Sequence, residues 1–159
     1  MQKLVLGGFL ILDNTQSAHI RAATVNDAIA IHLLNTFSLG YDYPIDKTRK
    51  RVAFIINNQN ARLLVAEVNG EVVGYIHATD YDCSYSDSLK NILALAVDED
   101  HRGKGIGQAL VTAVENWARN ANSIGVRLVS SAYRTGAHEF YKACGYTDRK
   151  DQKNFIKML

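Results

Sequence analysis

The sequence predicts an α/β fold with three layers, in which helices cover both faces of a mixed central sheet. Three observations lead to this prediction. Apolar stretches typical of strands are interspersed with segments whose apolar residues recur at helical spacing. These segments follow the order strand, two helices, three strands, helix, strand, helix, strand. Finally, a chain of 159 residues fits one domain and is long enough to bury a core.

The N-terminal half of the chain is predicted to contain a strand, two helices and a hairpin. The strand covers residues 19–23. Thr24 then begins a helix, with Asp27 three residues later, as in a capping box. Pro44 suits the first turn of the second helix. The dipeptide Asn69-Gly70 between apolar segments indicates a β-hairpin, because it fits the tight turns that join such strands.

The C-terminal half is predicted to alternate strands and helices. Residues 92–97 form a continuous apolar run, as expected for a central strand that is buried on both faces. Residues 79–88 before it are polar, and we expect an irregular segment there. Gly145 is the residue type expected just past a helix end. The remaining predicted elements are helices over residues 105–123 and 136–143 and strands over residues 126–130 and 154–159.

Charge and cysteine content restrict the classes of function. The net charge of +2 is too small to indicate a nucleic-acid partner. The basic run over residues 47–51 is explained by the solvated face of the second predicted helix. Cys83 and Cys144 are far apart and lack metal-ligand spacing, so we expect neither a metal site nor a disulfide framework. A reducing cytoplasm is the expected location.

Residues 1–18 are interpreted as an N-terminal extension that precedes a domain over residues 19–159. Residues 4–12 are apolar and follow Lys3, which resembles the core of a signal peptide. They fall far short of the ~20 apolar residues that a membrane-spanning helix needs, and no convincing cleavage site follows. We therefore expect no membrane partner, and an extra strand that pairs with a sheet edge or across a homodimer.

The most informative segment is an apolar strand, an acidic turn and a glycine-rich helix start. Glycine lets the backbone approach a ligand closely and adopt positive φ angles. A helix start presents unpaired N–H groups and a partial positive charge, which bind phosphate oxygens, and flanking cations add charge-assisted contacts. We therefore predict a phosphate cradle. Its residues are Arg102, Gly103, Lys104, Gly105, Ile106 and Gly107.

Other phosphate-binding turns fit this segment less well. A nucleotide P-loop needs a lysine followed by Ser or Thr after its last glycine, and none follows Gly107. The dinucleotide pattern needs a third glycine, but Ala109 and Leu110 occupy the region where it would lie. A purely structural strand-to-helix turn is the remaining alternative, and the alternation of three glycines with two cations makes it the weaker interpretation.

The chain resembles the GNAT superfamily of N-acetyltransferases. Its acetyl-CoA signature, [Gln/Arg]-x-x-Gly-x-[Gly/Ala], is matched by Arg102, Gly105 and Gly107. Residues 20–24 resemble the family's opening strand and helix start, and residues 137–146 resemble its late helix. These segments stand in the family's order, and the resemblance covers about residues 19–159. It implies a GNAT-like three-layer fold with a mostly antiparallel sheet that splays between its central strands.

The resemblance also implies acetyl-CoA as the acyl-donor substrate. The backbone of Leu95 and Val97 would pair with the pantetheine arm, and the turn over residues 102–107 would hold the pyrophosphate. One position departs from the family's pattern, because Arg134 stands where many members have Asn. Arg134 would either contact a cofactor phosphate or cap a surface turn.

By the same resemblance, a neutral amine attacks the acetyl thioester directly. The N–H of Val97 would hold the oxyanion, and Tyr141 would protonate the departing thiolate or contact the cofactor. A packing role for Tyr141 is the alternative. Family members often supply a glutamate base near the central strand, and residues 91–97 contain no carboxylate. His77 and a chain of waters are the candidates for accepting the amine proton, an ordinary polar residue of its strand is the alternative for His77, and the sequence identifies no base.

The expected acceptor is the primary amine of a small cationic molecule, such as a polyamine or an aminoglycoside-like compound, or a lysine-type amine of a protein. In the resembled family, the junction of the first two helices and the loop before the central strand shape the acceptor side, and both are aromatic and acidic here. Ordinary solvated loops are the alternative, and an acyl-CoA-binding sensor without turnover is the alternative function. The candidate acceptor residues are Tyr41, Asp42, Tyr43, His77, Tyr81 and Asp82.

Overall fold

A computed structural model describes residues 17–159 of the chain. The extra strand predicted for the N-terminal extension would lie mostly in residues 1–16, outside this described part. No helix in the described part is long and apolar enough to cross a membrane.

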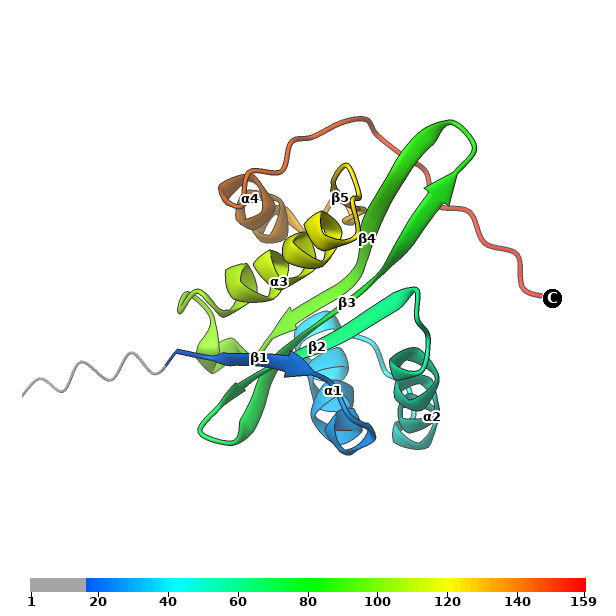
Figure 1. Ribbon diagram of the computed structural model, residues 1–159. Coiled ribbons are helices and arrows are strands. Elements are labelled where there is room, and N and C mark those ends of the chain that lie inside the picture. The colour runs from blue at the N-terminus through cyan, green and yellow to red at the C-terminus, as the bar shows by residue number, and fades with distance from the viewer. Residues whose placement is uncertain (1–16) are drawn as a thin grey trace, which may run out of the picture.

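The centre of the fold is a five-stranded sheet in the order β1-β2-β3-β4-β5 (Figure 1). The first four strands are antiparallel to their neighbours, and β5 is parallel to β4, which confirms the predicted mixed and mostly antiparallel sheet. The strands are β1 (His19–Ala22), β2 (Ala61–Val68), β3 (Glu71–Cys83), β4 (Ser86–Val97) and β5 (Val126–Leu128).

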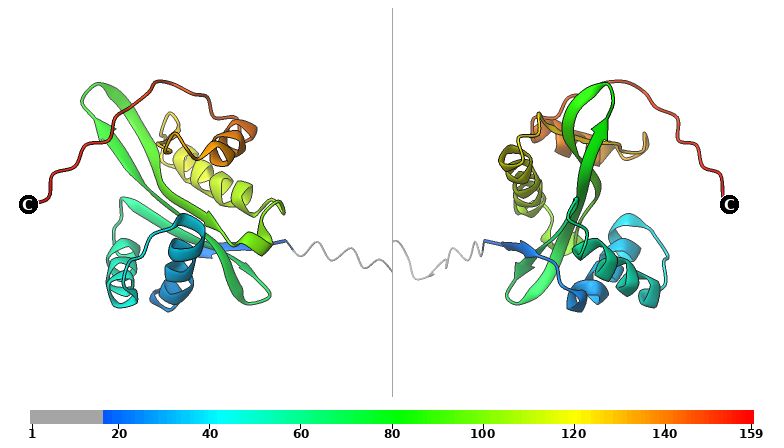
Figure 2. Two further views of the ribbon diagram at one scale, coloured as in Figure 1. Left: turned by 180° about the vertical axis from the view of Figure 1, so that it is seen from behind. Right: turned by 45° about the vertical axis from the view of Figure 1, so that its right-hand side comes forward.

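Helices cover both faces of this sheet, as predicted. Figures 1 and 2 show α1 and α2 together on one face and α3 and α4 on the other. The helical elements are the 3-10 turn η1 (Val25–Asp27), α1 (Ala28–Leu34), the π-helical turn η2 (Asn35–Leu39), α2 (Ile45–Ile56), the 3-10 turn η3 (Glu99–His101), α3 (Ile106–Asn120) and α4 (Thr135–Ala143).

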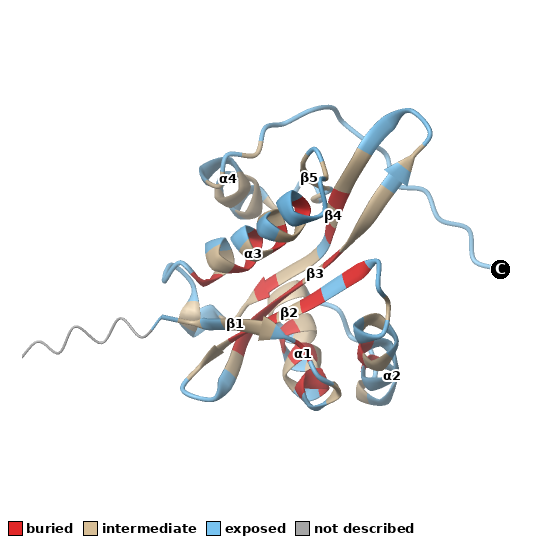
Figure 3. Cartoon of the chain, viewed as in Figure 1, coloured by how far each residue is buried: buried red, intermediate tan, exposed pale blue. Residues whose placement is uncertain are grey.

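Two apolar cores lie on opposite faces of the sheet. The alternation of side chains along β3 separates them, because Tyr75 packs with the α1/α2 core and Ile76 with the α3/α4 core. Leu34 and Val52 belong to the first core, and Leu110 of α3 belongs to the second. In Figure 3 the buried residues follow the middle of the sheet and the sides of α1 and α3 that face it.

Two segments differ from the prediction. Residues 79–88, expected to be irregular, form the outer parts of β3 and β4, which extend as a hairpin beyond the helices (Figure 1). Polar residues suit strands there, because the hairpin is covered by few neighbours and polar side chains pair across it: Lys90 binds Asp80. Residues 154–159, expected to be a strand, have no regular structure, and no strand among residues 17–159 pairs with them.

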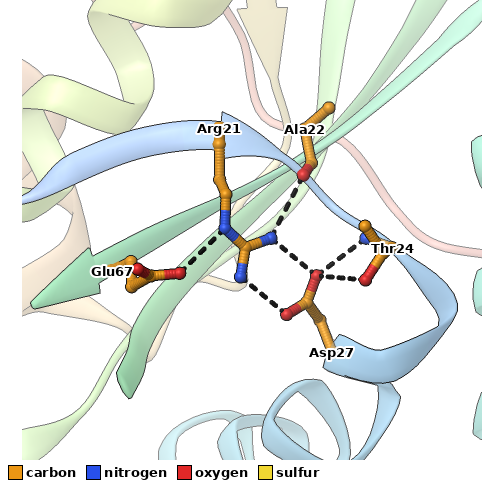
Figure 4. Close-up of polar contacts among 5 residues, drawn as sticks. All are labelled: Arg21, Ala22, Thr24, Asp27 and Glu67. Carbon is orange, nitrogen blue, oxygen red and sulfur yellow. Dashed lines mark hydrogen bonds and ion pairs between the residues drawn. The ribbon is translucent and has the colours of Figure 1, made fainter. Parts of the chain in front are cut away.

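The entry into α1 is fixed by one arginine, which joins three elements (Figure 4). Arg21 of β1 donates two hydrogen bonds to the carboxylate of Asp27, at 2.8 and 2.9 Å, and a third to Glu67 of β2 at 2.9 Å. Asp27 also accepts from the N–H of Thr24 at 2.7 Å, as the predicted capping box requires. The Arg21 guanidinium is the main reason why the pKa of Asp27 lies below its ordinary value.

We expect Asp27→Asn to destabilise the fold by about 1–2 kcal/mol, because the half-buried Arg21 keeps Glu67 but loses its two charge-assisted hydrogen bonds to Asp27. Because the pKa of Asp27 is lower in the folded protein than in the unfolded chain, the ion pair contributes its full stabilisation above about pH 4, the pKa of an unfolded aspartate. This stabilisation is lost as the pH falls through the pKa of Asp27 in the folded protein. Urea unfolding at neutral and acidic pH measures the free energy of unfolding of both proteins. The difference in this free energy between wild type and Asp27→Asn should shrink below pH ~4. Asp87→Asn, at an exposed position, is the matched control, and an equal loss there would contradict the assignment.

Candidate active site

Strands β4 and β5 separate, as the resemblance implied. They pair only over three positions, Lys90–Ile92 with Val126–Leu128. The other edge of β4 stays paired with β3 as far as Val97. The parallel partner is therefore missing along the second half of β4, and a gap opens in the sheet beside residues 93–97.

The backbone of β4 presents polar groups to this gap. Asp98 donates its N–H to Val73 on β3, at 2.8 Å. Because successive residues of a strand direct their peptide groups to opposite sides, those of Leu95 and Val97 face away from β3. The carbonyl of Val97 confirms this direction, since it accepts from Ser38 Oγ at 3.3 Å and Arg102 Nε at 3.1 Å rather than from β3. Both residues predicted to pair with the pantetheine arm thus have the required backbone orientation.

A cavity of about 130 Å³ occupies the gap. Its walls come from β4, from the chain after β5, from the end of η2 and from α4. The lining residues are Leu39, Tyr41, Ile92, Leu93, Ala94, Leu95, Leu128, Val129, Ser130, Ser131, Arg134, Ala137 and Tyr141. Four residues predicted for the site, Tyr41, Leu95, Arg134 and Tyr141, therefore meet around one cavity.

The glycine-rich turn lies directly after β4 and η3. Gly103 and Gly105 have φ angles of 73° and 79°, and a Cβ placed on either would meet nothing within 4 Å. The first bond of the following helix runs from the N–H of Ala109 to the carbonyl of Gly105. The amides of residues 103–108 donate to no acceptor in the described part of the chain. The turn thus offers unpaired N–H groups and open space, which is what an anion such as a pyrophosphate requires.

The two cations of the turn also fasten it to the strand end. Arg102 uses Nε to reach the carbonyl of Val97, and Lys104 donates to the carbonyl of Asp100 at 2.9 Å. Both side chains are exposed, and the Nη groups of Arg102 donate to no acceptor among residues 17–159. Arg102 is therefore able to hold the turn in place and still meet an anion with its outer nitrogens.

Gly107 has a different role from Gly103 and Gly105. A Cβ on Gly107 would lie 3.2 Å from the ring of Phe140 on α4, so the missing side chain lets α3 and α4 pack closely. This contact places the neighbouring Tyr141 beside the cavity. The sequence motif gave no sign of this role, because it treats the glycines of the turn alike.

Tyr141 is the main polar group that α4 brings to the cavity. Its ring packs edge-to-face against Phe140 and Tyr146, with centroids 5.1 and 5.7 Å apart. Burial raises the pKa of Tyr141 to about 12, so the hydroxyl is protonated at neutral pH. None of the side-chain hydrogen bonds found among residues 17–159 involves its hydroxyl. It is therefore available as a proton donor in the cavity.

The opposite wall is the π-helical turn η2, which sequence reasoning missed. Three elements hold it: Tyr75 of β3 donates to Asn35, Ser38 donates to Val97 of β4, and Arg134 at the start of α4 donates to the carbonyl of Leu39 at 2.9 Å. Arg134 thus joins the two walls of the cavity. Such π-helical turns are rare and are often found at functional sites. Its only sequence signal is Gly40, which ends the turn at a φ angle of 77°.

The predicted acceptor residues fall into two groups. Tyr41 lines the cavity, and Asp42 and Tyr43 follow it in the exposed loop before α2. Tyr81 and Asp82 do not line the cavity. They lie towards the far tip of the β3–β4 hairpin, where the guanidinium of Arg127 lies 4.3 Å from the Tyr81 ring.

His77 lies between these groups, on β3. It is paired in register with Ala94, which lines the cavity, and its side chain lies on the α1/α2 face of the sheet, as that of Tyr75 does. Burial, reinforced by Arg51, lowers the pKa of His77 below its ordinary value. The imidazole is therefore neutral at pH 7, the form that accepts a proton.

Comparison with known proteins agrees with this geometry. A sequence model of the Acetyltransferase (GNAT) family matches residues 28–146, about three quarters of the chain. The chain therefore belongs to the GNAT family, and the family predicted from the glycine-rich turn and the late helix is confirmed.

Curated relatives cover part of the domain. An uncharacterized N-acetyltransferase of Methanocaldococcus jannaschii is 32% identical over 100 residues, which are 60% of this chain and 43% of that protein. A second from the same organism is 40% identical over 87 residues, 54% of this chain and 53% of that protein. Streptothricin acetyltransferase of Escherichia coli is 30% identical over 82 residues, 52% of this chain and 45% of that protein. The chain spans about half the length of these relatives.

Solved structures share the fold over nearly their whole length. A transcriptional regulator from Bacillus halodurans has a TM-score of 0.79 and 21% identity, covering 88% of this chain and 99% of that one. An aminoglycoside acetyltransferase from an uncultured soil sample has a TM-score of 0.74 and 23% identity, covering 93% and 99%. The aminoglycoside acetyltransferase AAC(6')-Iy, solved with a bisubstrate analogue, has a TM-score of 0.79 and 18% identity, covering 89% and 99%. These likenesses confirm the predicted fold.

Proposed function

We propose that the chain transfers the acetyl group of acetyl-CoA to the primary amine of a small cationic molecule. The observation that carries this proposal is the continuity of one surface: the unpaired half of β4 leads directly into the open glycine turn, and Tyr141 lies beside it. One end of this surface suits a pyrophosphate, and the other suits a thioester. AAC(6')-Iy, which shares the fold, has been solved with CoA.

We assign the following roles to residues of this chain. The amides of residues 103–108, with Arg102 and Lys104, hold the pyrophosphate. The peptide groups of Leu95 and Val97 bind the pantetheine arm, and the N–H of Val97 faces the gap where the thioester oxygen would develop charge. The amine nitrogen forms a C–N bond to the acetyl carbon, the C–S bond breaks, and Tyr141 gives its proton to the thiolate.

The proposed acceptor site lies on the α1/α2 side of the cavity. Tyr41 forms part of the wall, and Asp42 adds negative charge beside it. The neutral His77, whose register partner Ala94 lines the cavity, would accept the proton of the attacking amine, directly or through water. Proteins named streptothricin acetyltransferase and aminoglycoside acetyltransferase, among the relatives and neighbours above, support a small-molecule amine. A lysine-type amine of a protein would have to enter the same cavity.

The direct test is the release of CoA thiol from acetyl-CoA, with and without a panel of amines. We expect turnover with polyamines or aminoglycosides and slower turnover with aryl amines and acidic amino acids. Binding of acetyl-CoA without turnover on any amine would favour the sensor function instead. Failure to bind acetyl-CoA at all would contradict both.

Reversing the charge at Asp42 should raise KM for a cationic acceptor by roughly 3- to 10-fold and leave acetyl-CoA affinity unchanged. The carboxylate lies in the loop next to Tyr41, so it attracts a cation towards the cavity. Added salt should reduce the difference in acceptor KM between wild type and Asp42→Lys, because it screens the charge at this position. Asp82→Lys is the matched control, since Asp82 lies near the hairpin tip. Steady-state kinetics measure both, and equal effects at the two positions would contradict an acceptor site beside Tyr41.

A further inference from the structure

Three neighbouring strands carry a polar cluster on the face of the sheet that packs against α1 and α2. The guanidinium of Arg127 on β5 lies 4.3 Å from the centre of the Tyr81 ring on β3, and its Nη1 donates to Asn91 Oδ1 on β4 at 2.7 Å. Side chains alternate along β3, so Tyr81 lies on the same face as Tyr75, which belongs to the α1/α2 core. Lys90, the neighbour of Asn91, packs against α3 on the opposite face.

The guanidinium of Arg127 has donors to spare. An arginine carries five N–H donors in a planar fork, and the bond to Asn91 uses one of them. Arg127 is half-buried, and no carboxylate among residues 17–159 forms an ion pair with it. The Tyr81 ring and Asn91 hold the fork in place, so little side-chain freedom is left to lose when a ligand binds. An oriented arginine without a counter-ion suits a carboxylate bound through two parallel hydrogen bonds.

This cluster opens into the same space as the proposed acceptor site. Ile92 of β4 and Leu128, which follows Arg127, line the active-site cavity. A larger groove of about 1560 Å³ is lined by both Arg127 and Tyr41. Asp42 follows Tyr41 in the exposed loop before α2, so the groove has a negative charge beside one end and a positive charge at the other.

We infer that Arg127 binds a carboxylate of the acceptor, so that the acceptor is an amine that also carries a carboxylate. This inference rests on the proposed function and narrows its acceptor class. Leu95, beside the proposed thioester site, lies four residues along β4 from Asn91, which is about 13 Å in an extended strand. The acceptor therefore carries its carboxylate several bonds away from the amine, as the side-chain amine of free lysine does. Such a molecule is still cationic, and its two ends match the two charges of the groove.

Lysine and lysinamide are a matched pair of acceptors, because the amide replaces only the carboxylate. Wild type should use lysine with a kcat/KM about 10-fold or more above that for lysinamide. Arg127→Met keeps an unbranched side chain and removes the charge, so kcat/KM for lysine should fall to the level for lysinamide. The value for lysinamide itself should stay within about twofold of wild type. Arg127→Lys should restore part of the preference, because it keeps the charge and loses the planar fork.

Arg62→Met is the matched control. Arg62 also lies over an aromatic ring, that of Trp117 at 4.9 Å, but on the α3 face of the sheet. This variant should leave the preference for lysine unchanged, with circular dichroism verifying the fold of each protein. Equal losses for both acceptors in Arg127→Met would assign Arg127 to joining β4 and β5, and would overturn the inference. A wild-type enzyme without a preference for lysine would overturn it as well.

Binding measurements separate this inference from the proposed function. Calorimetry on the CoA-loaded protein gives the affinities for lysine and lysinamide without requiring turnover. Tighter binding of lysine that is lost in Arg127→Met would support the carboxylate site even if no amine were acetylated, a result that would contradict only the proposed function. Equal affinities for the two ligands in wild type would overturn the carboxylate site, whether or not the enzyme turns over.

Discussion

Gly105→Val is expected to weaken acetyl-CoA binding by about 100-fold or more, a loss of about 2.7 kcal/mol. Gly105 precedes α3 with a φ angle of 79°, and the space around its Cα is empty of protein. A valine there would project into the space that the proposed pyrophosphate occupies. It would also disfavour the left-handed backbone that aims the amides of the turn.

The backbone strain must be separated from the loss of the anion site. Gly70 is the matched control, since its φ angle is 83° and a Cβ there also meets nothing within 4 Å. It lies in the β2–β3 turn and does not line the cavity. Gly70→Val should lower thermal stability much as Gly105→Val does, with acetyl-CoA affinity unchanged. Isothermal calorimetry gives the affinities, and equal losses of affinity in both variants would contradict the cradle.

Gly107 provides a second contrast within the same motif. Its absent side chain makes room for the Phe140 ring, so Gly107→Ala should act through the packing of α3 against α4. The expected result is a lower melting temperature and a lower kcat, because Tyr141 follows Phe140 on α4. Acetyl-CoA affinity should fall less than in Gly105→Val.

The sequence predicted the site best where the chemistry is local. The proposed cradle is one short segment, and the unpaired amides of a helix start follow from its glycines and the apolar strand before it. The capping box of Thr24 and Asp27 is equally local, and it formed as predicted. The sequence did not show that Arg21 would connect Asp27 to Glu67, because that contact joins residues 46 positions apart.

The parts of the structure that the sequence did not predict depend on contacts between residues far apart in the chain. The turn η2 becomes a wall of the cavity only through Tyr75, Ser38 and Arg134, and each of these bonds crosses the fold. The structure has a strand hairpin around Tyr81 where the sequence predicts an irregular segment, because polarity alone does not separate a solvated strand from an irregular segment. The last six residues have a strand pattern, and a pattern does not supply the neighbouring strand.

These long-range contacts also explain how the two walls of the cavity keep their separation. Arg134 stands at the start of α4 and bonds the carbonyl of Leu39, while Ser38 bonds the end of β4. The helix that carries Tyr141 and the loop that begins at Gly40 are thus fixed to the same turn. The proposed proton donor Tyr141 and the proposed acceptor loop at residues 41–43 are thus held on opposite sides of one cavity.

Tyr141→Phe is expected to lower kcat by about 10²-fold, while the affinity for acetyl-CoA stays within about twofold. The hydroxyl has no protein partner in the described part of the chain, and burial keeps its pKa near 12. It is therefore protonated at neutral pH. Loss of this proton donor affects the departing thiolate, whose charge develops only as the C–S bond breaks, so the effect belongs to kcat rather than to binding.

Tyr146→Phe is the matched control for this prediction. Its ring packs against Tyr141, burial raises its pKa as well, and its hydroxyl is enclosed, but it does not line the cavity. We expect kcat within about twofold of wild type for Tyr146→Phe. Single-turnover kinetics separate the chemical step from product release. If both variants lose kcat equally, the tyrosines act by packing. If Tyr141→Phe loses acetyl-CoA affinity alone, the hydroxyl is a cofactor contact and another group protonates the thiolate.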